Sequence, residues 1–115
     1  MKESHGNLEN EILNAVWKFE ENKCETNISV NDVYSILNAS TVPRAYTTIK
    51  TVMDRLVEKK LLVRNKMGKK YCYNSTISRY DMARVAIEKL AKQYFYSDMR
   101  MLMQAIEKEC LQSVG

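Results

Sequence analysis

A segment between Arg44 and Arg55 carries side chains that could bind a negatively charged polymer. Its outward polar positions are rich in Arg, Lys and Thr and nearly free of carboxylates: Arg44, Thr47, Thr48, Lys50, Thr51 and Arg55. Lys and Arg neutralise phosphates, and polar side chains of these types hydrogen-bond to base edges in the major groove of DNA. We therefore expect double-stranded DNA as the partner of this segment.

Positive charge is concentrated around the same segment. Residues 44–70 contain nine basic and two acidic side chains, a net charge of +7, whereas residues 1–43 carry −4 and residues 71–115 carry +1. The overall charge of +4 is thus a positive patch on a nearly neutral body. Such a patch is typical of proteins that release counterions from nucleic acid, although a solvated helix followed by a lysine-rich turn has the same composition.

The spacing of apolar residues predicts the elements that position this patch. Ala45, Ile49, Val52, Met53 and Leu56 recur at intervals of three and four, which predicts an amphipathic helix from Pro43 to about Lys60, with Pro43 at its first position. A helix from Ser29 to about Asn38 precedes it, with Asp32 completing a capping box. An earlier helix is predicted over residues 8–21, capped by Asn7 and anchored in the core by Trp17.

After Lys60 the pattern changes to that of strands. Residues 61–65 and 70–74 are predicted strands joined by a turn that contains Gly68, and a very short strand is expected within residues 26–29. Three helices followed by a hairpin are the order of a winged helix-turn-helix, so the fold class is mainly α with a small β-hairpin. The hairpin carries Lys66, Lys69 and Lys70, which we expect to contact phosphates.

Two further amphipathic helices, after Ser78 and after Ser97, complete the chain. Their apolar residues have no evident partner within one winged helix, so we expect them to form a homodimer interface. This predicts a winged-helix domain at residues 1–76 and a helical dimerisation region at residues 77–115. The expected interface residues are Met82, Val85, Leu90, Tyr94, Phe95, Leu102, Met103 and Ile106.

Other classes of function have little support. With His5 as the only histidine, no Gly-rich phosphate loop and no Ser-His-Asp set, we expect no enzyme and no cofactor. Cys24, Cys72 and Cys110 are far apart, so we expect no metal site and predict small apolar fillers in the reduced state. No apolar run is long enough for a membrane span and no signal peptide is evident, which predicts a cytoplasmic protein without a membrane partner.

The run from Ala45 to Leu62, followed by Gly68, Lys69, Lys70, Tyr71, Cys72 and Tyr73, resembles the penicillinase and methicillin-resistance repressor family, which includes copper-responsive repressors. Leu8, Glu11, Ile12, Val16 and Trp17 match in placement, so the resemblance covers about residues 7–96. It implies a homodimeric winged-helix transcriptional repressor that binds a palindromic operator, with interlocking C-terminal helices.

Together with the charge pattern, this resemblance implies steric repression. We expect Thr47, Thr48, Lys50 and Thr51 to lie nearest to base edges and phosphates in a major groove. Arg44, Tyr46, Arg55 and the lysines of the hairpin would hold the DNA backbone. Asp54 is interpreted as a salt-bridge partner within the helix, for example of Lys50 four residues away.

The resemblance leaves the inducing signal open. Antibiotic-responsive members are cleaved at an Asn-Phe bond in the dimerisation region, where the nearest match here is Gln104-Ala105. Copper-responsive members have paired C-terminal cysteines, where this chain has only Cys110. A sensor protease, thiol chemistry or another effector all stay open as the source of release from DNA. The alternative function is a winged-helix interaction module whose basic face binds an acidic protein.

Overall fold

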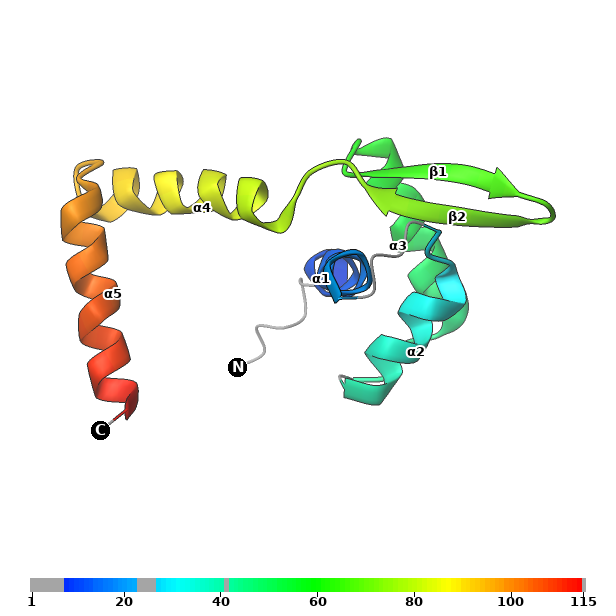
Figure 1. Ribbon diagram of the computed structural model, residues 1–115, viewed down its shortest axis with the longest axis horizontal. Helices are drawn as coiled ribbons and strands as arrows, with labels where there is room; N and C mark the ends of the chain where they lie inside the picture. The colour runs from blue at the N-terminus through cyan, green and yellow to red at the C-terminus, as the bar shows by residue number, and fades with distance from the viewer. Residues whose placement is uncertain (1–7, 23–26, 41, 115) are drawn as a thin grey trace. The chain divides into compact units, whose positions relative to one another are not determined.

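The computed structural model describes residues 8–22, 27–40 and 42–114 of the chain. The chain divides into two compact units, Met1–Ser78 and Arg79–Gly115, against an expected boundary after residue 76. The first unit contains the helices α1 (Leu8–Asn22), α2 (Val30–Ser40) and α3 (Tyr46–Glu58) and the strands β1 (Leu62–Met67) and β2 (Lys70–Ser75). The second contains the helices α4 (Arg79–Tyr94) and α5 (Met99–Val114) (Figure 1). The predicted fold class, mainly helical with one hairpin, is confirmed.

The first unit has a closed apolar core. α1 contacts α2, α3 and β2, and α3 also contacts β1, so the three helices and the hairpin share one interior. Apolar burial at this scale is the main contribution to the stability of a small domain. The buried side chains are Ile12, Leu13, Ala15, Val16, Trp17, Phe19, Ile28, Val30, Val33, Leu37, Ile49, Val52, Met53, Leu56, Leu62, Cys72 and Tyr73.

The hairpin is held to the rest of the first unit by hydrogen bonds of β2. β1 and β2 are antiparallel, with Leu62 opposite Ser75 and Met67 opposite Lys70. Ser75 donates from its backbone N–H and its hydroxyl to the Glu20 carboxylate of α1, at 2.9 and 2.7 Å. Ile28 forms an isolated antiparallel bridge with Tyr73, which matches the expected short strand at that position. These contacts fix where the hairpin leaves the core.

Two predicted anchors of the first unit are confirmed. The Trp17 indole N–H donates to the Ile77 carbonyl at 3.0 Å while its ring is buried, so this residue joins α1 to the end of the unit. At the start of α2, the Asp32 N–H donates to the Ser29 hydroxyl and the Ser29 N–H donates to the Asp32 carboxylate. This reciprocal pair is the predicted capping box. Asn7, which was predicted to cap α1, lies outside the described residues, and so do His5 and Cys24.

The predicted bounds of α3 were wrong at both ends. The helix begins at Tyr46, because the Arg44 N–H donates to the Asn38 side chain at 3.0 Å and Ala45 is extended. Ala45 is therefore exposed and not part of the buried face. At the other end, Lys60 lies in the left-handed region, with φ of 66°. The N–H groups of Lys60 and Leu61 donate to Val57 and Leu56, which closes the helix in a Schellman motif.

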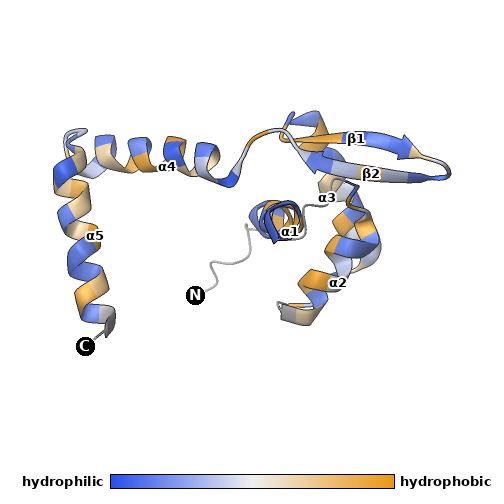
Figure 2. Cartoon of the chain, in the orientation of Figure 1, coloured by the Kyte–Doolittle hydropathy of each residue, from blue (hydrophilic) through white to orange (hydrophobic). Residues whose placement is uncertain are grey.

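The second unit lacks a closed core. Within its described residues, only Ala91 and Leu102 are buried. Hydrophobic residues nevertheless occur along both helices, as the hydropathy colouring of the cartoon shows (Figure 2). The residues predicted as buried in a dimer are largely exposed in the single chain: Val85, Leu90, Tyr94, Met103 and Ile106 are exposed, Met82 and Phe95 are partly covered, and Leu102 is buried.

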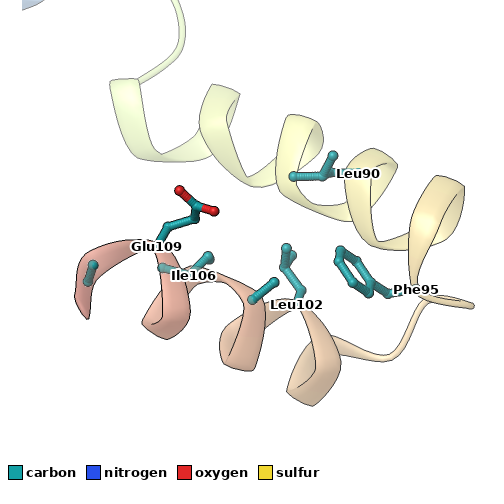
Figure 3. A pocket seen from close by; sticks show the side chains of 7 residues that line it. Leu90, Phe95, Leu102, Ile106 and Glu109 are labelled. Atoms are coloured by element: carbon teal, nitrogen blue, oxygen red, sulfur yellow. The ribbon is translucent and has the colours of Figure 1, made fainter. Parts of the chain in front are cut away.

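A groove lies between α4 and α5 within this unit. Its volume is about 550 Å³, and Leu90, Phe95, Leu102 and Ile106 point into it, with Glu109 at its edge (Figure 3). Cys110 also lines the groove and is exposed, so the prediction of a buried filler is wrong for Cys110 and confirmed for Cys72. Five of the predicted interface residues are thus exposed, and four of the eight line one groove.

Two negative findings concern the part of the chain that the structure describes. None of its helices is both long enough and apolar enough to cross a membrane. Within that same part, no group of three or more His, Cys, Asp or Glu side chains could hold a metal ion.

Candidate nucleic-acid interface

The outward face of α3 is polar and open to solvent. Ile49, Met53 and Leu56 face the core, so the helical period turns the residues between them outward. Thr47, Thr48, Thr51 and Arg55 are exposed and, with Val52, line a shallow hollow of about 340 Å³. Hydroxyl and guanidinium groups on one helix face can donate to base edges and to phosphates.

Arg44 and Tyr46 lie at the start of this face, and each is held by a neighbour. The Arg44 guanidinium is 3.6 Å from the Glu11 carboxylate of α1, and both side chains are about four-fifths covered. Tyr46 packs edge to face against Tyr34 of α2, with ring centroids 5.9 Å apart. Arg44 is therefore less available than a free surface arginine, whereas Tyr46 still exposes 41% of its surface.

Asp54 joins α3 to both strands of the hairpin. Its carboxylate accepts hydrogen bonds from the Lys50 ammonium at 2.9 Å, from the Arg64 guanidinium of β1 at 2.9 Å and from the Tyr73 hydroxyl of β2 at 2.8 Å. The predicted pair of Asp54 with Lys50 is confirmed. Arg64 and Tyr73 were not predicted as site residues, because their approach to Asp54 depends on how the hairpin packs. The sequence offered one local indication that the hairpin contributes to this site, which is the cation Arg64 at an exposed strand position.

The ionisation of this cluster suits neutral pH. Burial raises the pKa of the Asp54 carboxyl, but the hydrogen bonds from Lys50, Tyr73 and Arg64 outweigh it, so the pKa lies below its ordinary value. Burial, with the adjacent Asp54 carboxylate, raises the pKa of the Tyr73 hydroxyl. The hydrogen bond to Asp54 raises the pKa of the Arg64 guanidinium. Asp54 is thus charged while Tyr73 stays neutral as a donor.

The hairpin presents basic side chains at its exposed end. Lys66, Lys69 and Lys70 are all exposed, and Gly68 in the turn has a φ of +67°, which a glycine adopts without strain. Tyr71 offers a ring face on which the Arg64 guanidinium lies at 4.5 Å from the centroid, with the Lys66 ammonium at 6.0 Å. These cation–π contacts orient two cations of the hairpin β1–β2, which is the wing of the winged helix.

A second hollow lies where α2, α3 and the hairpin meet. It has a volume of about 210 Å³ and includes the start of α2 at Ser29, Val30 and Asn31. Lys50, Lys69 and Lys70 line it together with Tyr46, Tyr71 and Tyr73. The fold therefore brings lysines of α3 and of the hairpin, predicted separately from sequence, to the edge of one depression.

All ten residues that were predicted to contact DNA belong to the described part of the first unit. The hollow along α3 includes Thr47, Thr48, Thr51 and Arg55, and the hollow beside the hairpin includes Tyr46, Lys50, Lys69 and Lys70. Arg44 and Lys66 line neither of these two hollows. Arg44 is turned toward Glu11, and Lys66 lies near Tyr71 on the wing.

Solved structures resemble this chain. The Bacillus licheniformis BlaI monomer, in complex with the blaP half-operator, has 27% sequence identity and a TM-score of 0.50, and the match covers 64% of this chain and 82% of that one. MepR, a transcription regulator of the Staphylococcus aureus multidrug efflux pump MepA, has 18% identity and a TM-score of 0.53, over 95% and 79% of the two chains. The likeness to MepR concerns the fold alone.

Sequence comparison gives a more specific assignment. No curated protein sequence matches the chain significantly. The profile of the penicillinase repressor family, however, matches residues 5–113, which includes both units of the structure. The chain therefore belongs to the penicillinase repressor family of DNA-binding transcriptional regulators.

Proposed function

We propose that the protein represses transcription as a homodimer bound to a palindromic DNA operator. Each subunit would place α3 in a major groove, with Thr47, Thr48, Lys50 and Thr51 nearest to the bases. Tyr46, Arg55 and the wing lysines Lys66, Lys69 and Lys70 would contact the backbone, and Arg44 would do so if it left Glu11. One observation carries the proposal: Tyr46 and Lys50 of α3 line one hollow with Lys69 and Lys70 of the hairpin, and the exposed Thr and Arg side chains of the same helix line another.

The likeness to a DNA complex supports this proposal. BlaI, at 27% identity, is described bound to a half-operator as a monomer. A half-operator is one of two equivalent sites, so a whole operator suits two subunits. One small winged helix makes few contacts, and a two-fold symmetric dimer doubles them.

The second unit would supply the dimer contact. Its exposed apolar residues include Leu90 and Ile106, which line the groove between α4 and α5, and also Val85, Tyr94 and Met103. A second copy of the chain would cover them, together with Met82, Phe95 and Leu102. A stable interface buries about 800 Å² on each partner, which a face of two 16-residue helices can provide.

Binding of variants to DNA from upstream of the protein's own gene tests the division of roles. Thr48→Ala on α3 removes a group assigned to the bases and should reduce the preference for the operator over unrelated DNA, by up to about tenfold. Lys69→Gln on the wing should instead weaken binding to every sequence and reduce the salt slope by about one. Identical specificity profiles for the two variants would contradict the proposal.

A further inference from the structure

The carboxylate of Asp54 lies inside a surface that otherwise carries positive charge. It accepts from Lys50 on its own helix through one oxygen, and from Arg64 and Tyr73 of the hairpin through the other. One side chain thus links α3, β1 and β2. A single exposed ion pair contributes little, but a network with several donors on one carboxylate holds its members in place.

Both cations of this network remain partly exposed. The side chain of Lys50 is 44% exposed and that of Arg64 is 37% exposed. An ammonium has three N–H donors, so Lys50 keeps two of them for a base edge while one is directed to Asp54. Arg64 is held on two sides, by Asp54 and by the Tyr71 ring.

We propose that Asp54 is a positioning residue that determines specificity in the DNA interface. Its carboxylate fixes the hairpin against α3, orients Lys50 toward the bases and keeps Arg64 from binding phosphates of arbitrary sequence. This inference rests on the proposed DNA-binding function and adds to it a residue that touches no DNA itself.

Contacts with phosphates strengthen binding to DNA independently of its sequence. Each additional phosphate contact steepens the dependence of log K on log salt by about 0.9. When the salt is lowered from 1 M to 0.1 M, such a contact therefore increases the binding constant by an additional factor of roughly eight. Such a contact adds in full to the affinity for unrelated DNA, whereas at the operator a Lys50 that leaves the bases for a phosphate loses its base contact. A carboxylate that occupies two cations therefore lowers the affinity for unrelated DNA and increases discrimination.

Asp54→Asn tests the inference because it removes the charge and keeps the shape. Binding of the wild type and the variant to the operator and to an unrelated duplex of equal length is measured by fluorescence anisotropy in a salt series. For each of the two cations released, the variant should bind the unrelated duplex about eightfold more tightly at 0.1 M salt, with a slope steeper by about 0.9. The preference for the operator should fall by a similar factor.

Glu58→Gln is the matched control, since it makes the same change of charge on an exposed position of α3. If it steepened the slope as much as Asp54→Asn, the effect would be one of net charge and the inference would be overturned. A merely structural role of Asp54 would weaken binding to both duplexes without a steeper slope, and that result would also overturn it.

Arg64→Gln gives a second test that does not require the Asp54 variant to fold. In the presence of Asp54, loss of Arg64 should leave the salt slope unchanged, whereas a slope shallower by about one would show that Arg64 already binds phosphate and would overturn the inference. In the Asp54→Asn background the same loss should make the slope shallower by about one. If the wild type bound no DNA at all, the proposed function would fail as well; if it bound the operator with these variants unchanged, only this inference would fail.

Discussion

The two units of the chain differ in how far each buries its apolar side chains. In Met1–Ser78, three helices and a hairpin enclose a core and leave a polar, positively charged face outside. In Arg79–Gly115, two helices of similar length bury only Ala91 and Leu102 among their described residues. In proteins most of the stability of a helix comes from packing of its apolar face. This difference between the units is the reason for our proposal that the second unit associates with a second copy of the chain.

The largest effect is expected from the core of the first unit. Leu56→Ala removes a fully buried side chain of α3 and should lower the free energy of unfolding by about 2–5 kcal/mol, because a cavity remains. Val85→Ala in α4 deletes an exposed side chain and should cost the isolated subunit well under 1 kcal/mol. Chemical denaturation at low protein concentration checks both. Equal losses would contradict the distinction between the units.

The next effect concerns association of the second unit. Ile106→Asp places a charge in the groove and should weaken dimerisation by about 3 kcal/mol, roughly 100-fold in the dissociation constant. Light scattering would then change from twice the 13.4 kDa chain mass to the chain mass itself. Met101→Asp is the control, since Met101 is similarly exposed but does not line the groove. A monomeric wild type at micromolar concentration would contradict the assignment.

A smaller effect concerns pH in the first unit. The folded pKa of Asp54 lies below its ordinary 3.8, so its contribution is complete well above pH 3.8 and is lost as pH falls through the lower folded value. The folded pKa of Tyr73 is raised, so stability should fall as pH rises above the ordinary 10.0 of the unfolded tyrosine. In denaturation series, Tyr73→Phe should lack the alkaline part of this fall. A variant that lost stability above pH 10 as steeply as the wild type would refute the assignment.

The smallest effect concerns the end of α3. Lys60 has a positive φ of 66°, which costs a residue with a side chain about 1–2 kcal/mol, while glycine adds some entropy to the unfolded chain. Lys60→Gly should therefore raise the free energy of unfolding by about 0.5–1 kcal/mol. Thermal unfolding of the variant provides the measurement. A loss of stability would mean that the side chain of Lys60 makes a contribution larger than its backbone strain.

The sequence was most informative where periodicity and local chemistry decide the structure. The spacing of Ile49, Val52 and Met53 predicted the buried face of α3, and Ser29 with Asp32 predicted the start of α2. The start of α3 was missed, because the Asn38 side chain accepts from the Arg44 N–H across six residues.

Contacts between distant segments were the part that sequence could not supply. Asp54 lies 10 and 19 residues from Arg64 and Tyr73, and their hydrogen bonds depend on how the hairpin packs against α3. The pairing of Arg44 with Glu11 depends in the same way on the packing of α1. Local patterns in a sequence carry no signal for such pairs, although they decide which cations of the interface are available.

A nuclease footprint on the DNA upstream of the protein's own gene would show whether the protein binds a symmetric operator as a dimer. We expect two protected half-sites related by two-fold symmetry, with centres one helical turn of about 10 base pairs or a multiple of it apart, and protection that disappears as salt rises. Diffuse protection without a preferred site, or a single asymmetric site, would contradict a dimeric repressor and favour an acidic protein as the partner of the basic face.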